Sequence, residues 1–141
     1  MEVLLARRGI PVMAHIGFTP QSEHSLGGYR VQGRGGDAQR LVSAAKALQA
    51  AGAFAVLIEM VPEEVGAEIT RSVAVPTAGI GAGSGCDAQV LVWQDMAGLR
   101  TGRRPRFVKQ YADGQGVLCE AAREFAADVA AGMFPAPEHS F

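Results

Sequence analysis

The pattern that most constrains the fold is an alternation of short apolar runs with amphipathic segments. Apolar runs too short for lone helices occupy residues 10–15, 54–59, 75–80 and 89–94, and they are typical of buried strands. Segments with apolar residues at helical spacing follow them at 37–52, 62–73, 106–112 and 116–132. Strands that alternate with helices are usually parallel and joined by right-handed crossovers. The sequence therefore predicts an α/β fold built on a parallel sheet.

Several residues mark where helices should end or begin. Leucines, arginines and a closing glycine at 4–9 are typical of a last turn and C-cap, so the chain is expected to begin inside a helix. Asp37 is expected to cap a helix that Gly52 closes, and Pro62 to open the next helix. The apolar faces are expected at Ala38, Leu41, Val42, Ala45 and Leu48 in the first of these two helices and at Val65, Ile69 and Val73 in the second.

A carboxylate ends the run at 54–59. Glu59 follows five apolar residues and comes shortly before Pro62, so it lies at the carboxyl end of a buried strand. Barrels of the α/β type keep their catalytic groups at this end. One interpretation of Glu59 is a general base, because a largely apolar site raises the pKa of a carboxyl group toward neutral pH. The other is a strand-end carboxylate that pairs with a nearby arginine or caps a loop amide.

His15 is expected at the exit of the strand at 10–15, which is the equivalent position on the preceding strand. There the imidazole would donate to a developing oxyanion or orient the substrate. The alternative is a histidine with a structural hydrogen bond. A pair of groups at neighbouring strand ends is thus the first candidate site.

The stretch from Gly17 to Gly36 has no sustained period and contains a cluster of glycines around two arginines. A loop of this length is uncommon unless it is functional or disordered. Arg30 and Arg34 would bind a carboxylate, with glycine amides free to approach an anion. The alternative is a mobile surface loop whose arginines face water.

Weaker signals follow the third strand. The glycines of 79–83 suggest a phosphate site of the kind found in barrels, although the GxGxxG spacing is incomplete, and they equally suit close backbone packing. Asp87 and Asp95 lack partners at metal-ligand spacing, so both are interpreted as caps or turn residues.

Composition limits the class of protein. A chain of 141 residues with 48% hydrophobic and 19% charged residues suits one soluble domain over 1–141. Its net charge of −1 gives no reason to expect nucleic acid or a membrane surface as a partner. Cys86 and Cys119 lie far apart, which fits a reducing compartment, and no apolar run spans a bilayer, so the cytoplasm is expected. Four βα units make half of a barrel that usually needs about 250 residues.

Five segments together resemble one family. They are HIGFTPQS at 15–22, GGYRVQGRG at 27–35, EMVP at 59–62, GIGAG at 79–83 and FPAPEHSF at 134–141. In this order they resemble ketopantoate hydroxymethyltransferase, also called 3-methyl-2-oxobutanoate hydroxymethyltransferase. The resemblance covers the whole chain but only the carboxyl-terminal half of the family's (β/α)8 TIM barrel, strands 5 to 8 with their helices.

The resemblance implies an enzyme of pantothenate biosynthesis that moves a one-carbon unit from 5,10-methylenetetrahydrofolate, the co-substrate, to 3-methyl-2-oxobutanoate. It implies that Glu59 is the base that takes the C3 proton, that His15 contacts the substrate, and that the family forms homo-oligomers. It also implies Mg2+ held by carboxylates of the amino-terminal half, which this chain lacks. Two departures are Glu23-His24 in place of Val-Asn and Ala88 in place of Gly.

Two functional hypotheses follow. In the first, the chain supplies the base of the hydroxymethyltransferase and a complementing amino-terminal half supplies the metal site. In the second, it is a non-catalytic half-barrel that acts only as a binding partner.

Overall fold

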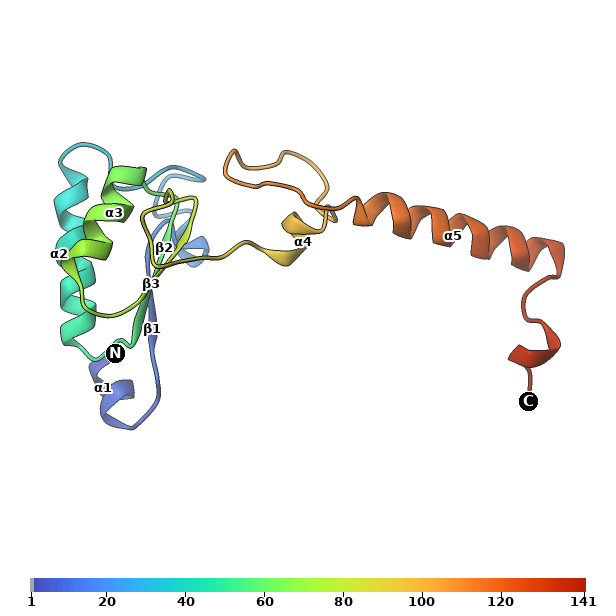
Figure 1. Ribbon diagram of the computed structural model, residues 1–141, viewed down its shortest axis with the longest axis horizontal. Helices are drawn as coiled ribbons and strands as arrows, with labels where there is room; N and C mark the ends of the chain where they lie inside the picture. The colour runs from blue at the N-terminus through green and yellow to red at the C-terminus, as the bar shows by residue number, and fades with distance from the viewer. Residues whose placement is uncertain (1) are drawn as a thin grey trace. The chain divides into compact units, whose positions relative to one another are not determined.

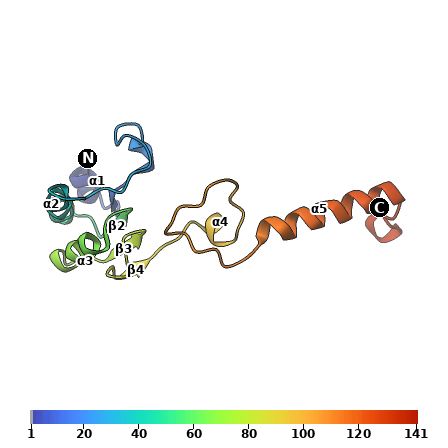
Figure 2. The same cartoon turned by 90° about the horizontal axis from the view of Figure 1, so that it is seen from above.

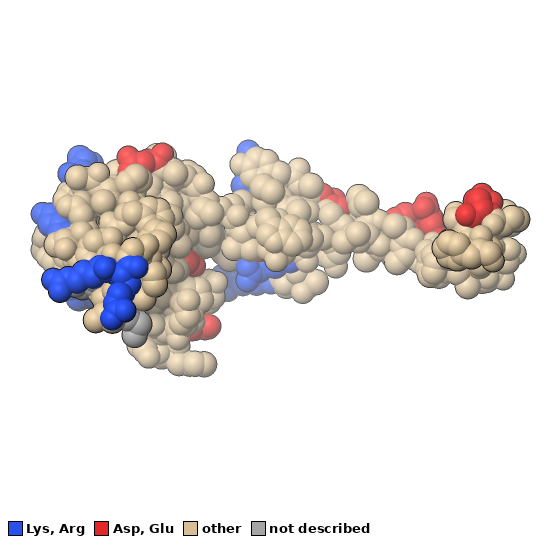
Figure 3. Space-filling model, turned by 90° about the horizontal axis from the view of Figure 1, so that it is seen from below, with Lys and Arg blue, Asp and Glu red and all other residues tan. Residues whose placement is uncertain are grey.

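The computed structural model describes residues 2–141 and divides the chain into two compact units, Met1–Val90 and Leu91–Phe141 (Figure 1). The division does not test the expectation of a single domain over 1–141, which stays a prediction. On the face seen in Figure 3, basic and acidic side chains are both present with uncharged surface between them, in keeping with the small net charge.

The first unit is built on a four-stranded parallel sheet in the order β1-β2-β3-β4. The strands are β1 (Met13–Gly17), β2 (Ala55–Glu59), β3 (Thr77–Ile80) and β4 (Ala88–Gln89). The helices are α1 (Glu2–Arg7), α2 (Asp37–Ala50) and α3 (Glu63–Ser72). The α/β fold with a parallel sheet is confirmed, and α2 and α3 lie on one side of the strands (Figures 1 and 2).

The core lies between that face of the sheet and the two helices. Val56 and Ile58 of β2 are fully buried there, together with Ile69 of α3. The predicted helix faces are confirmed, since the residues named for both helices are buried in this cluster or packed against it. Shortening a side chain such as Ile69 to Ala costs about 2–5 kcal/mol in a core of this kind. This packing fixes the sheet from which the candidate site projects.

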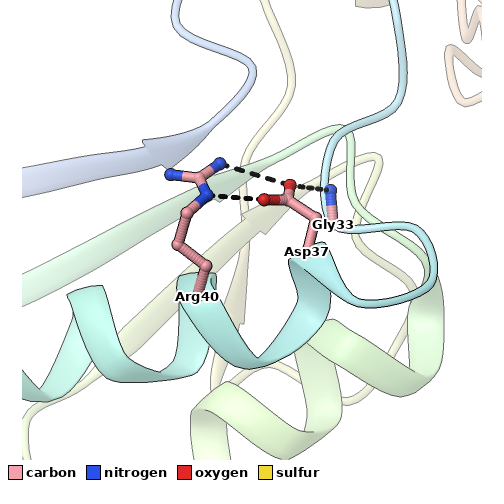
Figure 4. A network of polar contacts seen from close by, with 3 residues as sticks. All are labelled: Gly33, Asp37 and Arg40. Carbon is pink, nitrogen blue, oxygen red and sulfur yellow. Dashed lines mark hydrogen bonds and ion pairs between the residues drawn. The ribbon is translucent and has the colours of Figure 1, made fainter.

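Asp37 does not cap α2 in the predicted way. Gly36 is the N-cap residue and Asp37 is the first helical residue. Its carboxylate instead accepts from the backbone N–H of Gly33, at 3.0 Å, and from the guanidinium of Arg40 (Figure 4). The Arg40 contact, aided by Gly33 and opposed by burial, lowers the pKa of Asp37. Asp37 therefore ties the glycine-rich loop to the start of α2.

The long loop after β1 is partly ordered by packing. It holds a short 3-10 helix, Pro20–Ser22. The side chain of Phe18 is fully buried, and the centroid of its ring lies 4.4 Å from that of Tyr29. The backbone N–H of Gln32 donates to the carbonyl of Met60 at 2.9 Å. The loop is thus attached to the chain that leaves β2.

The second unit contains α4 (Trp93–Met96), α5 (Gly114–Ala131) and a 3-10 helix, Pro137–His139. The strand predicted at 89–94 is wrong beyond Gln89, because a helical turn begins at Trp93. The helix predicted at 106–112 is also wrong. The backbone of this segment forms hydrogen bonds that do not follow a helical pattern. For example, the N–H of Tyr111 donates to the carbonyl of Met96 at 2.9 Å.

The last predicted helix is confirmed as α5, with Asp113 capping its start and Gly132 in the left-handed conformation after its end. Its predicted apolar face is not buried in this chain. Leu118 is 62% exposed and Phe125 is 56% exposed. No helix in residues 2–141 combines the length and apolar character needed to cross a membrane.

Candidate active site

Glu59 is the last residue of β2 and lies in register with Gly17 of β1 and Ile80 of β3. Side chains alternate along a strand, so Glu59 and Leu57 lie on the sheet face opposite to the one that packs against the helices. Only 8% of Glu59 is exposed. The predicted position, a carboxylate at the carboxyl end of a buried parallel strand, is confirmed. Its catalytic role stays a prediction.

His15 lies in the middle of β1, so its predicted place at the strand exit is wrong. The strand continues to Gly17 because all five of its residues pair with β2. His15 is in register with Leu57, and its side chain therefore emerges on the same face as Glu59. The imidazole is partly buried. The structure brings the two predicted site residues together across neighbouring strands.

The nitrogen Nε2 of His15 lies 3.1 Å from the oxygen Oε2 of Glu59. This distance suits a hydrogen bond, but the N–H is not aimed at the oxygen, and Nε2 is buried without an aligned partner in the described part of the chain. We therefore treat the contact as electrostatic. A buried polar nitrogen without a hydrogen bond is costly.

Burial raises the pKa of the Glu59 carboxyl above its ordinary value, and the charge of a protonated His15 opposes this rise. Removing water from around a carboxyl group penalises its charged form, and a nearby cation favours that form. The rise moves Glu59 toward the range in which a carboxylate accepts a proton from carbon effectively at neutral pH. The electrostatics thus suit a general base.

Two backbone features that the sequence reasoning did not identify fix the position of Glu59. A Cβ on Gly17 would lie 2.1 Å from the carbonyl oxygen of Glu59, and Gly17 has a φ of +88°, so only glycine fits. Met60 has a φ of +49°, the left-handed region that a non-glycine residue rarely adopts. Strain of about 1–3 kcal/mol at such positions clusters at functional sites. The glycine was visible in the sequence, whereas nothing in the letters marks Met60.

Arg30 and Arg34 are both exposed on the glycine-rich loop. No hydrogen bond or ion pair joins either of them to His15 or Glu59 in the structure of residues 2–141. Arg34 instead lines a separate cavity of about 650 Å³, on the side of the sheet where α2 and α3 lie. Substrate binding by the two arginines stays a prediction.

The glycines at 79–83 serve close packing. A Cβ on Gly83 would lie 2.3 Å from the side chain of Glu63, and the carboxylate of Glu63 accepts from the hydroxyl of Ser84 at 3.1 Å. The carboxylate of Glu63 already accepts from Ser84 beside these glycines, and a negative charge there disfavours an anion. The geometry favours the packing interpretation over the phosphate site.

Asp87 and Asp95 form structural contacts. The carboxylate of Asp87 accepts from the backbone N–H and the hydroxyl of Thr77, at 2.8 and 2.9 Å, and these bonds lower its pKa. Asp95 is buried and accepts from Arg100 with both oxygens at 3.1 Å. The interpretation of both as caps or turn residues is consistent with these contacts.

The described residues do not offer a magnesium site. Mg2+ prefers octahedral oxygen ligands. No group of three or more His, Cys, Asp or Glu side chains that would hold a metal is found among residues 2–141. The pair of His15 and Glu59 supplies only one carboxylate. Ligands outside this chain, as the resemblance implies, stay a prediction.

The chain is similar to known proteins of one family. The sequence model of the family described as Ketopantoate hydroxymethyltransferase matches residues 3–137. A 3-methyl-2-oxobutanoate hydroxymethyltransferase of Nocardioides sp. is 71% identical over 137 residues, which cover 97% of this chain and 46% of that protein. Proteins of the same name from Saccharopolyspora erythraea and Mycobacterium leprae are 64% and 63% identical, with 97% of this chain and 47% and 48% of theirs covered.

The chain thus spans about half the length of the curated relatives that it matches. Its parallel strands with crossover helices are half of a (β/α)8 barrel of this family.

Proposed function

Because the chain belongs to the ketopantoate hydroxymethyltransferase family, we propose that it supplies the general base of a hydroxymethyl transfer in pantothenate biosynthesis. In the overall reaction, 5,10-methylenetetrahydrofolate, 3-methyl-2-oxobutanoate and water give tetrahydrofolate and 2-dehydropantoate. The C3–H bond of the keto acid breaks, and a bond forms between C3 and the transferred carbon. The difficult step is removal of the C3 proton.

In this proposal Glu59 takes the C3 proton. The observation that carries it is a carboxylate that is nine-tenths buried at the carboxyl end of a parallel strand, 3.1 Å from a histidine nitrogen without an aligned partner. Burial favours the protonated form of Glu59, which stabilises the state after proton transfer. General-base catalysis of this kind contributes roughly 10²–10⁴-fold to the rate.

His15 orients the keto acid. Its Nε2 lies beside Glu59 on the same sheet face, so a substrate oxygen bound to this nitrogen is held next to the base. When His15 donates to that oxygen, it also stabilises charge that develops there as the proton leaves. Held in this way, C3 stays within reach of the carboxylate.

The proposal includes groups outside this chain. A complementing amino-terminal half would hold Mg2+ near the keto acid carbonyl, where the ion would act as an electrophile. A homo-oligomer and a cytoplasmic location complete the proposal; the first comes from the family resemblance and the second from the composition of the chain.

The alternative function is a non-catalytic half-barrel that only binds a partner. The exposed apolar side chains of α5 favour this alternative, since a helix usually buries such a face. The same face would also be covered in a complete enzyme.

A growth test separates the two functions. A bacterial strain that lacks its own hydroxymethyltransferase and needs added pantothenate would receive this chain together with an amino-terminal half from a relative. Growth without pantothenate, lost in Glu59→Gln although the protein is still produced, is the expected result. Failure of the pair to restore growth while the two halves form a stable complex would favour the binding partner.

A further inference from the structure

The backbone changes direction at Met60, the residue that follows β2. Its φ of +49° lies in the left-handed region, and no other non-glycine residue of 2–141 has a positive φ. Outside glycine, and to a lesser degree asparagine and aspartate, a residue keeps this conformation only where the surrounding structure holds it there. The surroundings of Met60 therefore maintain a conformation that methionine does not favour.

The alternation of side chains along β2 reverses at Met60. Val56 and Ile58 face the helices, and Glu59 lies on the opposite face of the sheet. If the chain continued as an extended strand, Val61 would share the face of Glu59, because alternate residues lie on one face. Val61 is instead buried in the core cluster with α2 and α3. Met60 alone absorbs this shift by one position, as the extra residue of a bulge does.

Backbone hydrogen bonds from three segments hold this turn. The N–H of Phe18, just after β1, donates to the carbonyl of Glu59 at 2.8 Å. The N–H of Met60 donates to the carbonyl of Ile80, the last residue of β3, at 2.9 Å. The carbonyl of Met60 accepts from the N–H of Gln32 in the glycine-rich loop, also at 2.9 Å. The peptide groups that follow Glu59 are thus fixed by both neighbouring strands and by the loop.

An extended backbone at Met60 would displace one of its two neighbours. Either Val61 would leave the core, or Glu59 would turn away from the face on which His15 lies. A general base must lie within hydrogen-bond reach of the proton that it removes. A displacement of about 1 Å can lower the rate by about 10²-fold. The conformation of Met60 therefore bears directly on proton transfer to Glu59.

We propose that Met60 is a positioning residue for the base, and that its left-handed backbone, not its side chain, holds the Glu59 carboxylate on the face of His15. This inference rests on the proposed function, in which Glu59 takes the C3 proton. A role of the backbone predicts that activity follows the ease with which the residue at position 60 becomes left-handed. A role of the side chain predicts that activity follows its size and apolar character.

Substitutions at position 60 separate these two roles. Glycine adopts the left-handed conformation freely and asparagine more readily than most residues, whereas a β-branched residue is an outlier there. With Mg2+ and an amino-terminal half from a relative, exchange of the C3 proton is measured at saturating 3-methyl-2-oxobutanoate. Met60→Gly and Met60→Asn should stay within about threefold of the unchanged rate, and Met60→Val should lose about tenfold or more. KM for the keto acid should change less than about twofold in each variant.

Met60→Leu is the matched control, because leucine keeps an apolar side chain of similar size without a branch at Cβ. If the side chain carried the role, Met60→Leu would keep the rate, and Met60→Gly and Met60→Asn would lose it. That ranking would overturn the inference, as would exchange at the full rate by Met60→Val. If thermal melting shows that Met60→Val does not fold, the ranking of the other three variants still decides.

Infrared titration of the carboxyl band gives a readout that does not need turnover. Subtracting the spectrum of the same variant with Glu59→Gln isolates the Glu59 carboxyl. Its pKa, raised by burial and opposed by His15, should stay raised in Met60→Gly and Met60→Asn and fall toward the ordinary value in folded Met60→Val. An unchanged pKa in Met60→Val would refute the inference and leave the proposed function standing. The expected pKa pattern without exchange by the unchanged chain would refute the proposed function and leave the effect of Met60 on Glu59 standing.

Discussion

Replacing Glu59 by Gln should raise the stability of the chain at neutral pH. Burial raises the pKa of this carboxyl, so the folded chain binds its proton more tightly than the unfolded chain does. Such a group contributes stability below its unfolded pKa, and the contribution is lost as pH rises through the folded pKa. Gln keeps the size of the side chain and cannot ionise. The variant should therefore keep its stability as pH rises, whereas the original chain loses stability when Glu59 ionises.

The size of the effect follows from the linkage between protonation and folding. Each unit by which burial raises the pKa corresponds to about 1.4 kcal/mol of stability lost once the pH has passed the folded pKa. A difference of 1 kcal/mol moves the melting temperature of a domain this long by about 3–5 °C. The raised pKa is the net result of burial and of the opposing charge of His15, 3.1 Å away. The difference between variant and original should accordingly grow as pH rises from about 4.5 toward 8.

Thermal melting followed by circular dichroism between pH 4 and 8, at one protein concentration, measures this difference. Asp87→Asn provides a control of opposite sign, because hydrogen bonds from Thr77 lower the pKa of Asp87. Its contribution is present above the unfolded pKa and is lost as pH falls through the folded pKa. Asp87→Asn should thus be less stable than the original at neutral pH and approach it in acid. A Glu59→Gln variant that melts no higher at pH 7 than the original would refute a buried carboxylate.

Two further predictions concern the backbone and the assembly. Gly17→Ala should destabilise the chain by about 2 kcal/mol or more, because its Cβ would collide with the Glu59 carbonyl at a φ of +88°. Gly9→Ala is the control, since Gly9 is a left-handed glycine with open space around it. A melting temperature of Gly17→Ala as high as that of Gly9→Ala would contradict the prediction. The isolated chain should self-associate, since a half-barrel leaves strand edges and an apolar sheet face uncovered. Light scattering that showed a monodisperse monomer would count against that expectation.

The elements of the first unit were predictable because short-range signals and tertiary packing agree there. The apolar run that ends at Glu59 is too short for a helix, and Pro62 cannot donate to a ladder. Both signals place the strand and its end correctly. The stripe containing Val65 and Ile69 likewise matched the buried face of α3. Local and global preferences coincide at these positions.

The errors arose where tertiary contacts decided the outcome. His15 was expected at a strand exit because Gly17 resembles the start of a loop, yet pairing with β2 carries the strand through that glycine. Residues 89–94 are largely apolar and β-branched, a composition that suits a short strand or a helix equally. The turn at Trp93 is accompanied by the ion pair of the buried Asp95 with Arg100, which no periodicity reveals.

The candidate site was only partly readable from the sequence. Glu59 and His15 were both identified, but their separation of 3.1 Å depends on strand register, which sequence spacing does not supply. Nothing in the sequence indicated the left-handed backbone at Met60, since methionine does not favour this conformation. The arginines of the glycine-rich loop were grouped with this site, whereas the structure places Arg34 in a separate cavity.

Exchange of the C3 proton of 3-methyl-2-oxobutanoate into deuterated water tests the central claim most directly. The measurement needs no folate, so it isolates proton removal by the base. With an amino-terminal half from a relative and Mg2+, the chain should catalyse exchange, and the chain alone should not. Glu59→Gln in the same combination should lower the exchange rate by roughly 10²-fold or more, because the amide cannot accept the proton. Exchange at the full rate by the Glu59→Gln combination would show that Glu59 is not the base.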